Sequence, residues 1–181
     1  MKRFEKPQKW ADHYTEKAKK DNYPARSVYK LQEIQNKTRI IKPGHRVLDL
    51  GCAPGSWLLY AAQIVGEKGR VSGIDLKSVS ISLPAHAKAY QGDIYAIDEA
   101  LAQAIGHNFD VVMSDMAPDT TGIKDVDAAR SHLLCEAALS VAKERLAGGG
   151  AFICKIFQGA DFKSFSDAVK QVFRQHKIFK P

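Results

Sequence analysis

The chain has 181 residues, of which 45% are hydrophobic, a composition that suits one globular domain with a sizeable core. No apolar run approaches the ~18 residues of a membrane span, and no apolar stretch follows the charged start of the chain, so we expect neither a membrane span nor a signal peptide. The three cysteines (Cys52, Cys135 and Cys154) are far apart in the sequence and odd in number. We expect them to be reduced core or turn residues of a cytoplasmic protein, and we expect no metal site.

The net charge of +7 is unevenly distributed along the chain. Residues 1–46 hold 13 Lys or Arg against 5 Asp or Glu, a balance of +8, whereas residues 47–181 hold 14 against 15, a balance of −1. Basic side chains with aromatic residues between them are the expected electrostatic footprint of a protein that binds a polyanion. A solvated, lysine-rich helical face is the alternative, and charge alone favours neither interpretation.

Apolar runs and turns predict alternating strands and helices after a helical N-terminal region. Residues 10–20 are polar and helix-tolerant, and Val28, Leu31 and Ile34 then form one apolar face of a helix. Further along the chain, we expect strands at 46–50, 70–76, 87–90, 109–114, 151–157 and 176–179, and helices at 56–65, 97–105, 128–146 and 161–174. Repeated strand–helix units predict a parallel, doubly wound α/β sheet that binds its ligand outside the carboxyl ends of the strands.

The most informative stretch is residues 47–57, where an apolar run breaks at Gly51, turns through Pro54 and Gly55, and continues into a helical pattern. This strand, turn and helix form the place where open α/β sheets bind nucleotides. The glycines are spaced G-x-x-x-G, not G-x-G-x-x-G as in dinucleotide sites, and Pro54 has no N–H to offer a phosphate. The turn therefore predicts a nucleotide-like ligand without phosphates, and S-adenosylmethionine fits. Trp57 packs either on this ligand or in the core.

Two aspartates follow later strands. Asp75 ends the second strand, 24 positions after Gly51, where a carboxylate can accept hydrogen bonds from both ribose hydroxyls of a bound adenosine. Asp93 follows the third strand, where a carboxylate could accept from an adenine amine. Either one alone would be an ordinary turn or helix-cap aspartate. Their shared position after strands, in register with the glycine turn, favours the ligand-binding interpretation.

Lys155 is the most anomalous residue, because its charged side chain interrupts an apolar strand. Asp115 follows the preceding strand. A buried lysine costs free energy unless it is paired or neutralised. A structural salt bridge between Lys155 and Asp115 is one interpretation. In the other, Lys155 is a general base that releases its proton readily because of burial and a second cation, for which Lys30 is the candidate. Asp115 would oppose that release, so geometry must decide the balance.

The residues after the fourth strand narrow the class of substrate. Methyltransferases that act on the amine nitrogens of bases commonly carry Asn/Asp-Pro-Pro-aromatic at this position, whereas residues 115–118 read Asp-Met-Ala-Pro, with no aromatic ring to stack a flipped base. A hydroxyl nucleophile needs a base more than an amine does, and Lys155 provides one. The 2′-OH of an RNA ribose is such a nucleophile, and it is also the group that distinguishes RNA from DNA.

Together these motifs resemble the FtsJ-type (RrmJ-like) ribosomal RNA 2′-O-methyltransferases over essentially the whole chain. The resemblance is carried by residues 10–14, 25–31, 49–57, 91–93, 113–118, 148–150 and 155–159. It implies a Rossmann-like fold that binds S-adenosylmethionine, and methylation of a uridine ribose of 23S rRNA. It also implies that Lys30, Asp115 and Lys155 are catalytic. The family's fourth catalytic residue, a glutamate on a final strand, has no counterpart before Pro181, so the chain is either truncated or a natural variant. We expect truncation, because such a sheet normally closes with a final antiparallel strand, and its loss would leave an apolar edge exposed.

On this interpretation, residues 1–45 are an RNA-binding extension and residues 46–181 are the methyltransferase core. The predicted cofactor-binding residues are Gly51, Gly55, Trp57, Asp75, Asp93 and Asp115. The predicted RNA-binding residues are Lys2, Arg3, Lys6, Lys9, Lys17, Lys19, Lys20 and Arg26. We expect a monomer whose partner is RNA in the large ribosomal subunit, with no DNA, membrane or metal.

Two other functions remain open from the sequence. A catalytically inactive RNA-binding ribosome assembly factor would share the fold, and the missing glutamate is its only support. The intact set of Lys30, Asp115 and Lys155 argues against it. An NAD-linked oxidoreductase would also share the fold, but the glycine turn lacks the spacing of a dinucleotide site.

Overall fold

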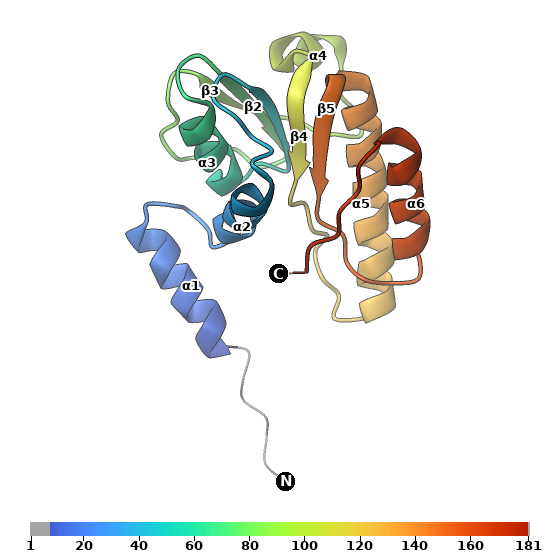
Figure 1. The fold of residues 1–181 in the computed structure, drawn as a ribbon. Coiled ribbons are helices and arrows are strands. Elements are labelled where there is room, and N and C mark those ends of the chain that lie inside the picture. Colours follow the sequence, from blue (N-terminus) through green and yellow to red (C-terminus); the bar gives the residue numbers. More distant parts are fainter. Residues whose placement is uncertain (1–7, 181) are drawn as a thin grey trace.

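The computed structural model describes the backbone of residues 8–180 and the side chains of residues 13–180. In this part of the chain, five strands form one sheet in the order β3-β2-β1-β4-β5, and every neighbouring pair is parallel. The strands are β1 (Arg46–Leu50), β2 (Arg70–Asp75), β3 (Ala87–Gln91), β4 (Phe109–Ser114) and β5 (Leu146–Cys154). The predicted parallel α/β sheet is confirmed, and the carboxyl ends of all the strands meet at one edge (Figure 1).

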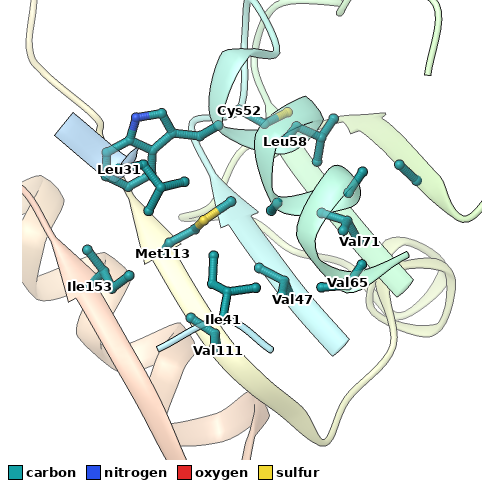
Figure 2. Close-up of a cluster of buried hydrophobic side chains, with 14 residues drawn as sticks. Leu31, Ile41, Val47, Cys52, Leu58, Val65, Val71, Val111, Met113 and Ile153 are labelled. Carbon is teal, nitrogen blue, oxygen red and sulfur yellow. The ribbon is translucent and has the colours of Figure 1, made fainter. Parts of the chain in front are cut away.

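Helices cover both faces of the sheet (Figure 1). The helices are α1 (Gln8–Lys20), α2 (Val28–Thr38), α3 (Ser56–Val65), α4 (Glu99–Ile105), α5 (Lys124–Arg145) and α6 (Phe162–Val172). Val47 of β1 points to the face covered by α2 and α3, where it joins the core cluster of Figure 2. Leu48, the next residue, points to the face covered by α4 and α5. This alternation follows from the two-residue period of a strand, and it explains why the central strands are apolar on both sides.

Helix α1 extends away from the sheet, but its C-terminal end is anchored to the core (Figure 1). Ala18 is buried in a small cluster with Tyr23 and Val28, and Leu59 and Tyr60 of α3 pack against this cluster. The Tyr23 hydroxyl donates a hydrogen bond to Gln63 Oε1 at 2.6 Å. The position of α1 relative to the core is therefore set at its last turn. In the described part of the chain, no helix combines the length and apolarity that crossing a bilayer requires.

The predicted helix at 128–146 and the predicted strand at 151–157 would leave the glycines at 148–150 between them, but the structure places these glycines differently. Helix α5 ends at Arg145 and β5 begins at the next residue, so the three glycines lie inside the strand. Phe109 pairs with Leu146 and Val111 pairs with Ala151, so the glycines occupy an irregularity in the β4–β5 ladder. Gly149 has a φ of +82°, which glycine adopts without steric cost. The strand then ends at Cys154, three residues before the predicted end.

The prediction of a strand at 176–179 is wrong. Residues 174–180 follow α6 as an irregular segment that pairs with no strand of the sheet in the described part of the chain. Side-chain contacts lie just before this segment and within it. The Phe173 ring stacks on Phe152 of β5 with ring centroids 6.0 Å apart, and Lys37 Nζ lies 5.7 Å from the Phe179 ring centroid. Residues 176–179 have a strand-like apolar pattern, but a strand also needs a partner whose backbone groups pair with its own.

Candidate active site

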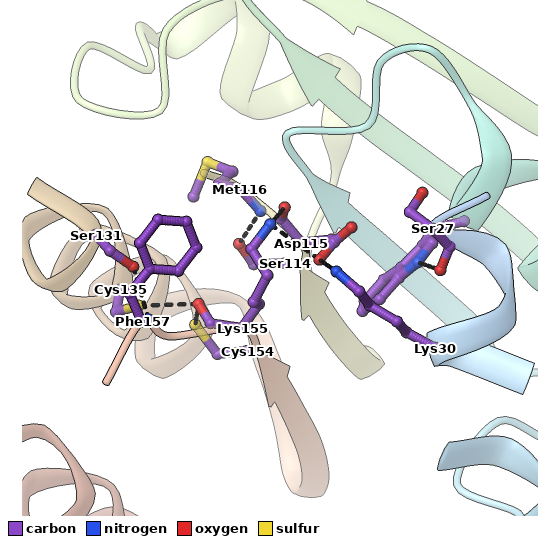
Figure 3. A network of polar contacts seen from close by, with 11 residues as sticks. Ser27, Lys30, Ser114, Asp115, Met116, Ser131, Cys135, Cys154, Lys155 and Phe157 are labelled. Carbon is purple, nitrogen blue, oxygen red and sulfur yellow. Dashed lines mark hydrogen bonds and ion pairs between the residues drawn. The ribbon is translucent and has the colours of Figure 1, made fainter. Parts of the chain in front are cut away.

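The ends of β4 and β5 bring Asp115 and Lys155 together. Ser114 and Cys154 are partners in the parallel ladder, so the next residue of each strand continues the same register. The Lys155 N–H donates to the Ser114 carbonyl at 2.9 Å. The Lys155 ammonium lies 3.1 Å from Asp115 Oδ1 and also donates to the Asp115 carbonyl oxygen (Figure 3). Lys155 therefore lies just beyond the strand, not inside it as predicted, and its side chain returns across the strand ends.

Lys30 reaches the same carboxylate from α2. Its ammonium lies 3.5 Å from Asp115 Oδ1, so one carboxylate faces two lysines (Figure 3). The side chain of Lys30 is 42% exposed, whereas those of Lys155 and Asp115 are 22% and 16% exposed. Asp115 Oδ1 is buried and lacks a hydrogen bond of normal geometry, so its contacts with the two ammonium groups are ionic. Partial burial weakens solvent screening of these charges, so this cluster differs from an ordinary surface salt bridge.

Hydrogen bonds between the residues before α2 and the start of α3 position Lys30. The Ser56 hydroxyl accepts from the Ala25 N–H at 2.8 Å and donates to the Ala25 carbonyl at 3.0 Å. The Trp57 indole N–H donates to the Ser27 carbonyl at 2.9 Å. Trp57 is buried in the core and also lines a small cavity at the glycine turn. These contacts tie the segment that leads to Lys30 to the helix that begins at the glycine turn.

The glycine turn requires glycine at both of its ends. Gly51 and Gly55 have φ values of +75° and +115°, in the left-handed region that side chains disfavour. A Cβ atom at Gly51 would lie 2.2 Å from Met116 Cγ, and one at Gly55 would lie 2.7 Å from Ile81 Cδ1. A side chain at either position would therefore be strained and would collide with the residues that pack against the turn.

Asp75 and Asp93 lie at the carboxyl edge of the sheet, and both also make local hydrogen bonds. Asp75 Oδ2 accepts from the Ala53 N–H at 2.9 Å, and Oδ1 accepts from the Lys77 N–H at 2.8 Å. Asp93 Oδ1 accepts from the Tyr95 N–H at 2.9 Å. Each carboxylate oxygen has a second lone pair, so these turn contacts leave acceptor capacity for a ligand. The predicted ligand roles of both residues remain predictions.

Asp49 is a buried carboxylic residue that the sequence analysis did not include in the site. It lies in β1, is 1% exposed, and its Oδ2 atom has no hydrogen-bond partner. Together with Asp115, it lines a cavity of about 40 Å³ at the glycine turn. Burial raises the pKa of Asp49 well above its usual range, and the charges of Asp115 and Asp75 raise it further. A charged residue inside an apolar strand is the pattern that drew attention to Lys155, and the same pattern could have identified Asp49 from the sequence.

The substitution Asp49→Asn is expected to remove a loss of stability that grows as the pH rises. Below the pKa of the unfolded chain, about 3.9, Asp49 is neutral in both states. As the pH rises toward the raised native pKa, the unfolded chain ionises while the native state holds its proton. The wild-type free energy of unfolding therefore falls by up to about 1.4 kcal/mol per pH unit from this group. Urea unfolding of the ligand-free protein gives the free energy of unfolding of Asp49→Asn relative to the wild type. This relative stability should be higher at pH 7 than at pH 5. A stability difference that does not grow with pH would contradict the raised pKa.

The predicted RNA-binding residues are placed only in part. Lys17, Lys19 and Lys20 are exposed on α1, and Arg26 is exposed in the segment before α2. Lys17 Nζ lies 4.7 Å from the centroid of the Tyr29 ring. Lys2, Arg3 and Lys6 lie outside the described residues, as does the side chain of Lys9. The RNA contacts of all eight remain predictions.

Comparison with known proteins shows which family the chain belongs to. Residues 23–181 match the family model of the FtsJ-like methyltransferases. The chain is 61% identical over 178 residues to the ribosomal RNA large subunit methyltransferase E of Desulforapulum autotrophicum, covering 97% of this chain and 88% of that protein. It is 58% identical over 177 residues to the protein of the same name from Desulfosudis oleivorans, covering 97% and 85%.

A solved structure from Plasmodium falciparum, described as a ribosomal RNA methyltransferase, superposes with a TM-score of 0.77. It is 26% identical in sequence, and the match covers 87% of this chain and 91% of that chain. The chain belongs to the FtsJ-like methyltransferase family and is a methyltransferase.

Proposed function

We propose that this protein transfers a methyl group from S-adenosylmethionine to a ribose 2′-OH of RNA, and specifically to a uridine of 23S rRNA in the large ribosomal subunit. The observation that carries the proposal is the convergence of Lys155, Asp115 and Lys30 beside the glycine turn, at the carboxyl edge of the sheet. The relatives named ribosomal RNA large subunit methyltransferase E support the choice of substrate.

The residues around the glycine turn fit S-adenosylmethionine better than a dinucleotide. Asp49, Asp75 and Asp115 place three carboxyl groups near the turn, and the charges of Asp75 and Asp115 act on Asp49. Such a set disfavours a pyrophosphate but suits a ligand with a sulfonium and an ammonium group. Asp49 Oδ2, buried and without a partner, is an acceptor available to a cationic group at the small cavity. Asp75 and Asp93 would hold the ribose hydroxyls and the adenine amine.

The three central residues have separate roles in the proposed reaction. The sulfonium of the bound cofactor supplies an already activated methyl group, so the protein needs chiefly to align the reacting groups and remove a proton. Lys155 must be a neutral amine when it accepts the proton of the 2′-OH, and the transfer makes it an ammonium. Asp115 orients the Lys155 ammonium at 3.1 Å, and Lys30 offsets the charge of Asp115 from 3.5 Å. Because Lys30 is the most exposed of the three, it can also contact the substrate.

Methyl transfer to large ribosomal subunits tests the proposal directly. Subunits from cells that lack the enzyme would be incubated with the protein and tritiated S-adenosylmethionine, with fully methylated subunits and DNA as controls. We expect stoichiometric incorporation at a single ribose, mapped as one 2′-O-methyluridine in 23S rRNA. Subunit binding without incorporation would overturn the enzymatic proposal and favour the inactive assembly factor. Incorporation on a base would place the reaction in a different class.

The exposed lysines of α1 provide the proposed contact with RNA phosphates. Ala18 fixes the last turn of the helix against the core, while Lys17, Lys19 and Lys20 around it face solvent. Each lysine can neutralise one phosphate and release condensed counterions. This surface would position the RNA without reading its sequence, whereas Lys30 and Lys155 would act at the reacting ribose.

A further inference from the structure

Two cysteines lie on either side of the backbone of Lys155. Cys135 belongs to α5 and Cys154 is the last residue of β5. The Cys135 thiol donates to the Lys155 carbonyl oxygen at 3.1 Å, and Cys154 Sγ lies 3.6 Å from the same oxygen (Figure 3). Both cysteines are free thiols. Residues 19 positions apart in the sequence therefore place their sulfur atoms at one carbonyl group.

The surroundings of the two sulfur atoms favour reaction with each other. A hydrogen bond from Cys154 lowers the pKa of Cys135, against the effect of its burial, and Ser131 and the Lys155 ammonium lower it further. The pKa of Cys154 is raised, because it shares its proton with Cys135. A thiol that loses its proton more readily than usual, beside a second thiol, is the arrangement that supports thiol–disulfide exchange. Buried cysteines with inert, apolar surroundings would show no such pairing.

One residue of the pair also borders a groove. Cys135 is buried, but Cys154 is only half-buried and lines a groove of about 1350 Å³ between α2, β5 and α6. Lys30, Asp115 and Lys155 line the same groove. The proposal requires that a small molecule in this groove reach Cys154 Sγ.

We propose that Cys135 and Cys154 are a redox-sensitive pair, which a small-molecule disulfide oxidises to an intramolecular bridge that slows methyl transfer by displacing Lys155. In the first step, one cysteine sulfur attacks the small disulfide, forming a mixed disulfide and releasing one small thiol. In the second step, the other cysteine sulfur attacks the mixed disulfide and releases the second small thiol. Two protein thiols are oxidised, one small disulfide is reduced to two thiols, and two protons pass to the leaving thiolates. The activity readout rests on the proposed function.

The bridge acts on the active site through the end of β5. A disulfide needs a sulfur–sulfur distance near 2.05 Å and Cα atoms within about 4.4–6.8 Å. Cys135 must then leave its hydrogen bond to the Lys155 carbonyl, and Cys154 must move toward α5. Cys154 is covalently joined to Lys155, whose ammonium lies 3.1 Å from Asp115. A displacement of about 1 Å at a reacting group can cost on the order of a hundredfold in rate.

The experiment compares reduced and oxidised protein in two independent readouts. The protein would be treated with dithiothreitol or glutathione disulfide, desalted, and assayed for methyl transfer to undermethylated large subunits. Intact mass and a non-reducing peptide map report the bridge without reference to activity. The variants Cys135→Ala and Cys154→Ala each remove one partner. Cys52→Ala is the matched control, because Cys52 is a buried cysteine of the glycine turn and is not part of the pair. The ratio of oxidised to reduced rate is compared within each variant.

We expect the oxidised wild type to lose about 2 Da, yield a linked 135–154 peptide, and transfer methyl groups at least about tenfold more slowly, with recovery in dithiothreitol. Cys52→Ala should keep this ratio, and the two pair variants should bring it close to one. Failure of the linked peptide to form, or a bridged protein with an unchanged rate, overturns the proposal. A reduced protein that transfers no methyl group refutes the proposed function instead. The peptide map would still decide whether the pair forms a bridge.

Discussion

Replacement of Lys155 by methionine is expected to lower kcat for methyl transfer by about 10²–10⁴-fold, the usual contribution of a general base. Methionine keeps the length of the side chain and its packing beside the Phe157 ring, which lies 6.0 Å from the lysine ammonium. It removes the only atom in this side chain that can accept a proton. Affinity for S-adenosylmethionine should stay close to that of the wild type, because the carboxyl groups around the glycine turn are untouched. Single-turnover transfer at saturating cofactor, with calorimetric titration of the cofactor, measures both quantities.

Two matched variants show whether this loss is specific. Lys30→Met removes the ammonium that lies 3.5 Å from Asp115, and we expect a smaller loss, because this side chain is more exposed and only offsets the charge of Asp115. Lys37→Met, on the same helix, removes an exposed lysine that pairs with Glu33 and should leave transfer unchanged. A Lys155→Met protein that binds the cofactor and transfers at a near-normal rate would refute the assignment of Lys155 as the base. Asp115 and Lys155 would then form a structural salt bridge.

Much of the fold was predictable because local patterns and sheet geometry agreed. The strand at 46–50 and the helix at 56–65 match β1 and α3 in every residue. Gly51 and Gly55, read as a turn, adopt the positive φ values that such a turn needs. The approach of Asp115 to Lys155 was also predictable, since residues that follow neighbouring parallel strands meet at one edge of the sheet.

What the sequence did not reveal depends on contacts between distant segments. The glycines at 148–150 are typical of a loop, but the β4–β5 ladder absorbs them as an irregularity between Phe109 and Val111. The segment 176–179 has strand-like residues, but whether it pairs depends on a partner strand and not on its own pattern. Asp49 is an acidic residue inside an apolar strand, which makes it unusual in the sequence, but its missing hydrogen-bond partner and the cavity beside it are visible only in the structure.

The cysteines show the same limit. Their spacing in the sequence suggested isolated core or turn residues, and all three are indeed free thiols. The sequence could not show that α5 crosses β5 so that Cys135 and Cys154 reach the same carbonyl oxygen. Helix-on-sheet packing sets this contact, because the crossing of the two elements decides which of their residues meet. Spacing alone is therefore a poor guide to which thiols can react with one another.

Reversal of charge at Lys17, Lys19 and Lys20 is expected to weaken RNA binding by about a hundredfold at ~0.1 M salt. Each phosphate contact contributes about 0.7–0.9 to the slope of log affinity against log salt, so the triple Lys→Glu variant should flatten that slope by about 2. Affinity for S-adenosylmethionine should not change, because α1 contacts the core through Ala18 and not through the glycine turn. Binding of a 23S rRNA fragment, titrated at several salt concentrations, gives both the affinity and the slope.

The control must match the change in net charge and keep α1 folded. Lys42, Lys68 and Lys88 are exposed lysines at or before the starts of β1, β2 and β3, at the opposite edge of the sheet from the site, and their reversal alters net charge equally. Glutamate near the C-terminal end of α1 also opposes the helix dipole, so a Lys→Gln triple variant separates loss of contact from loss of helix. If both α1 variants bind RNA as the control triple does, with equal salt slopes, the lysines of α1 are only a solvated face. RNA recognition would then rest on Arg26, Lys30 and the other residues near the strand ends.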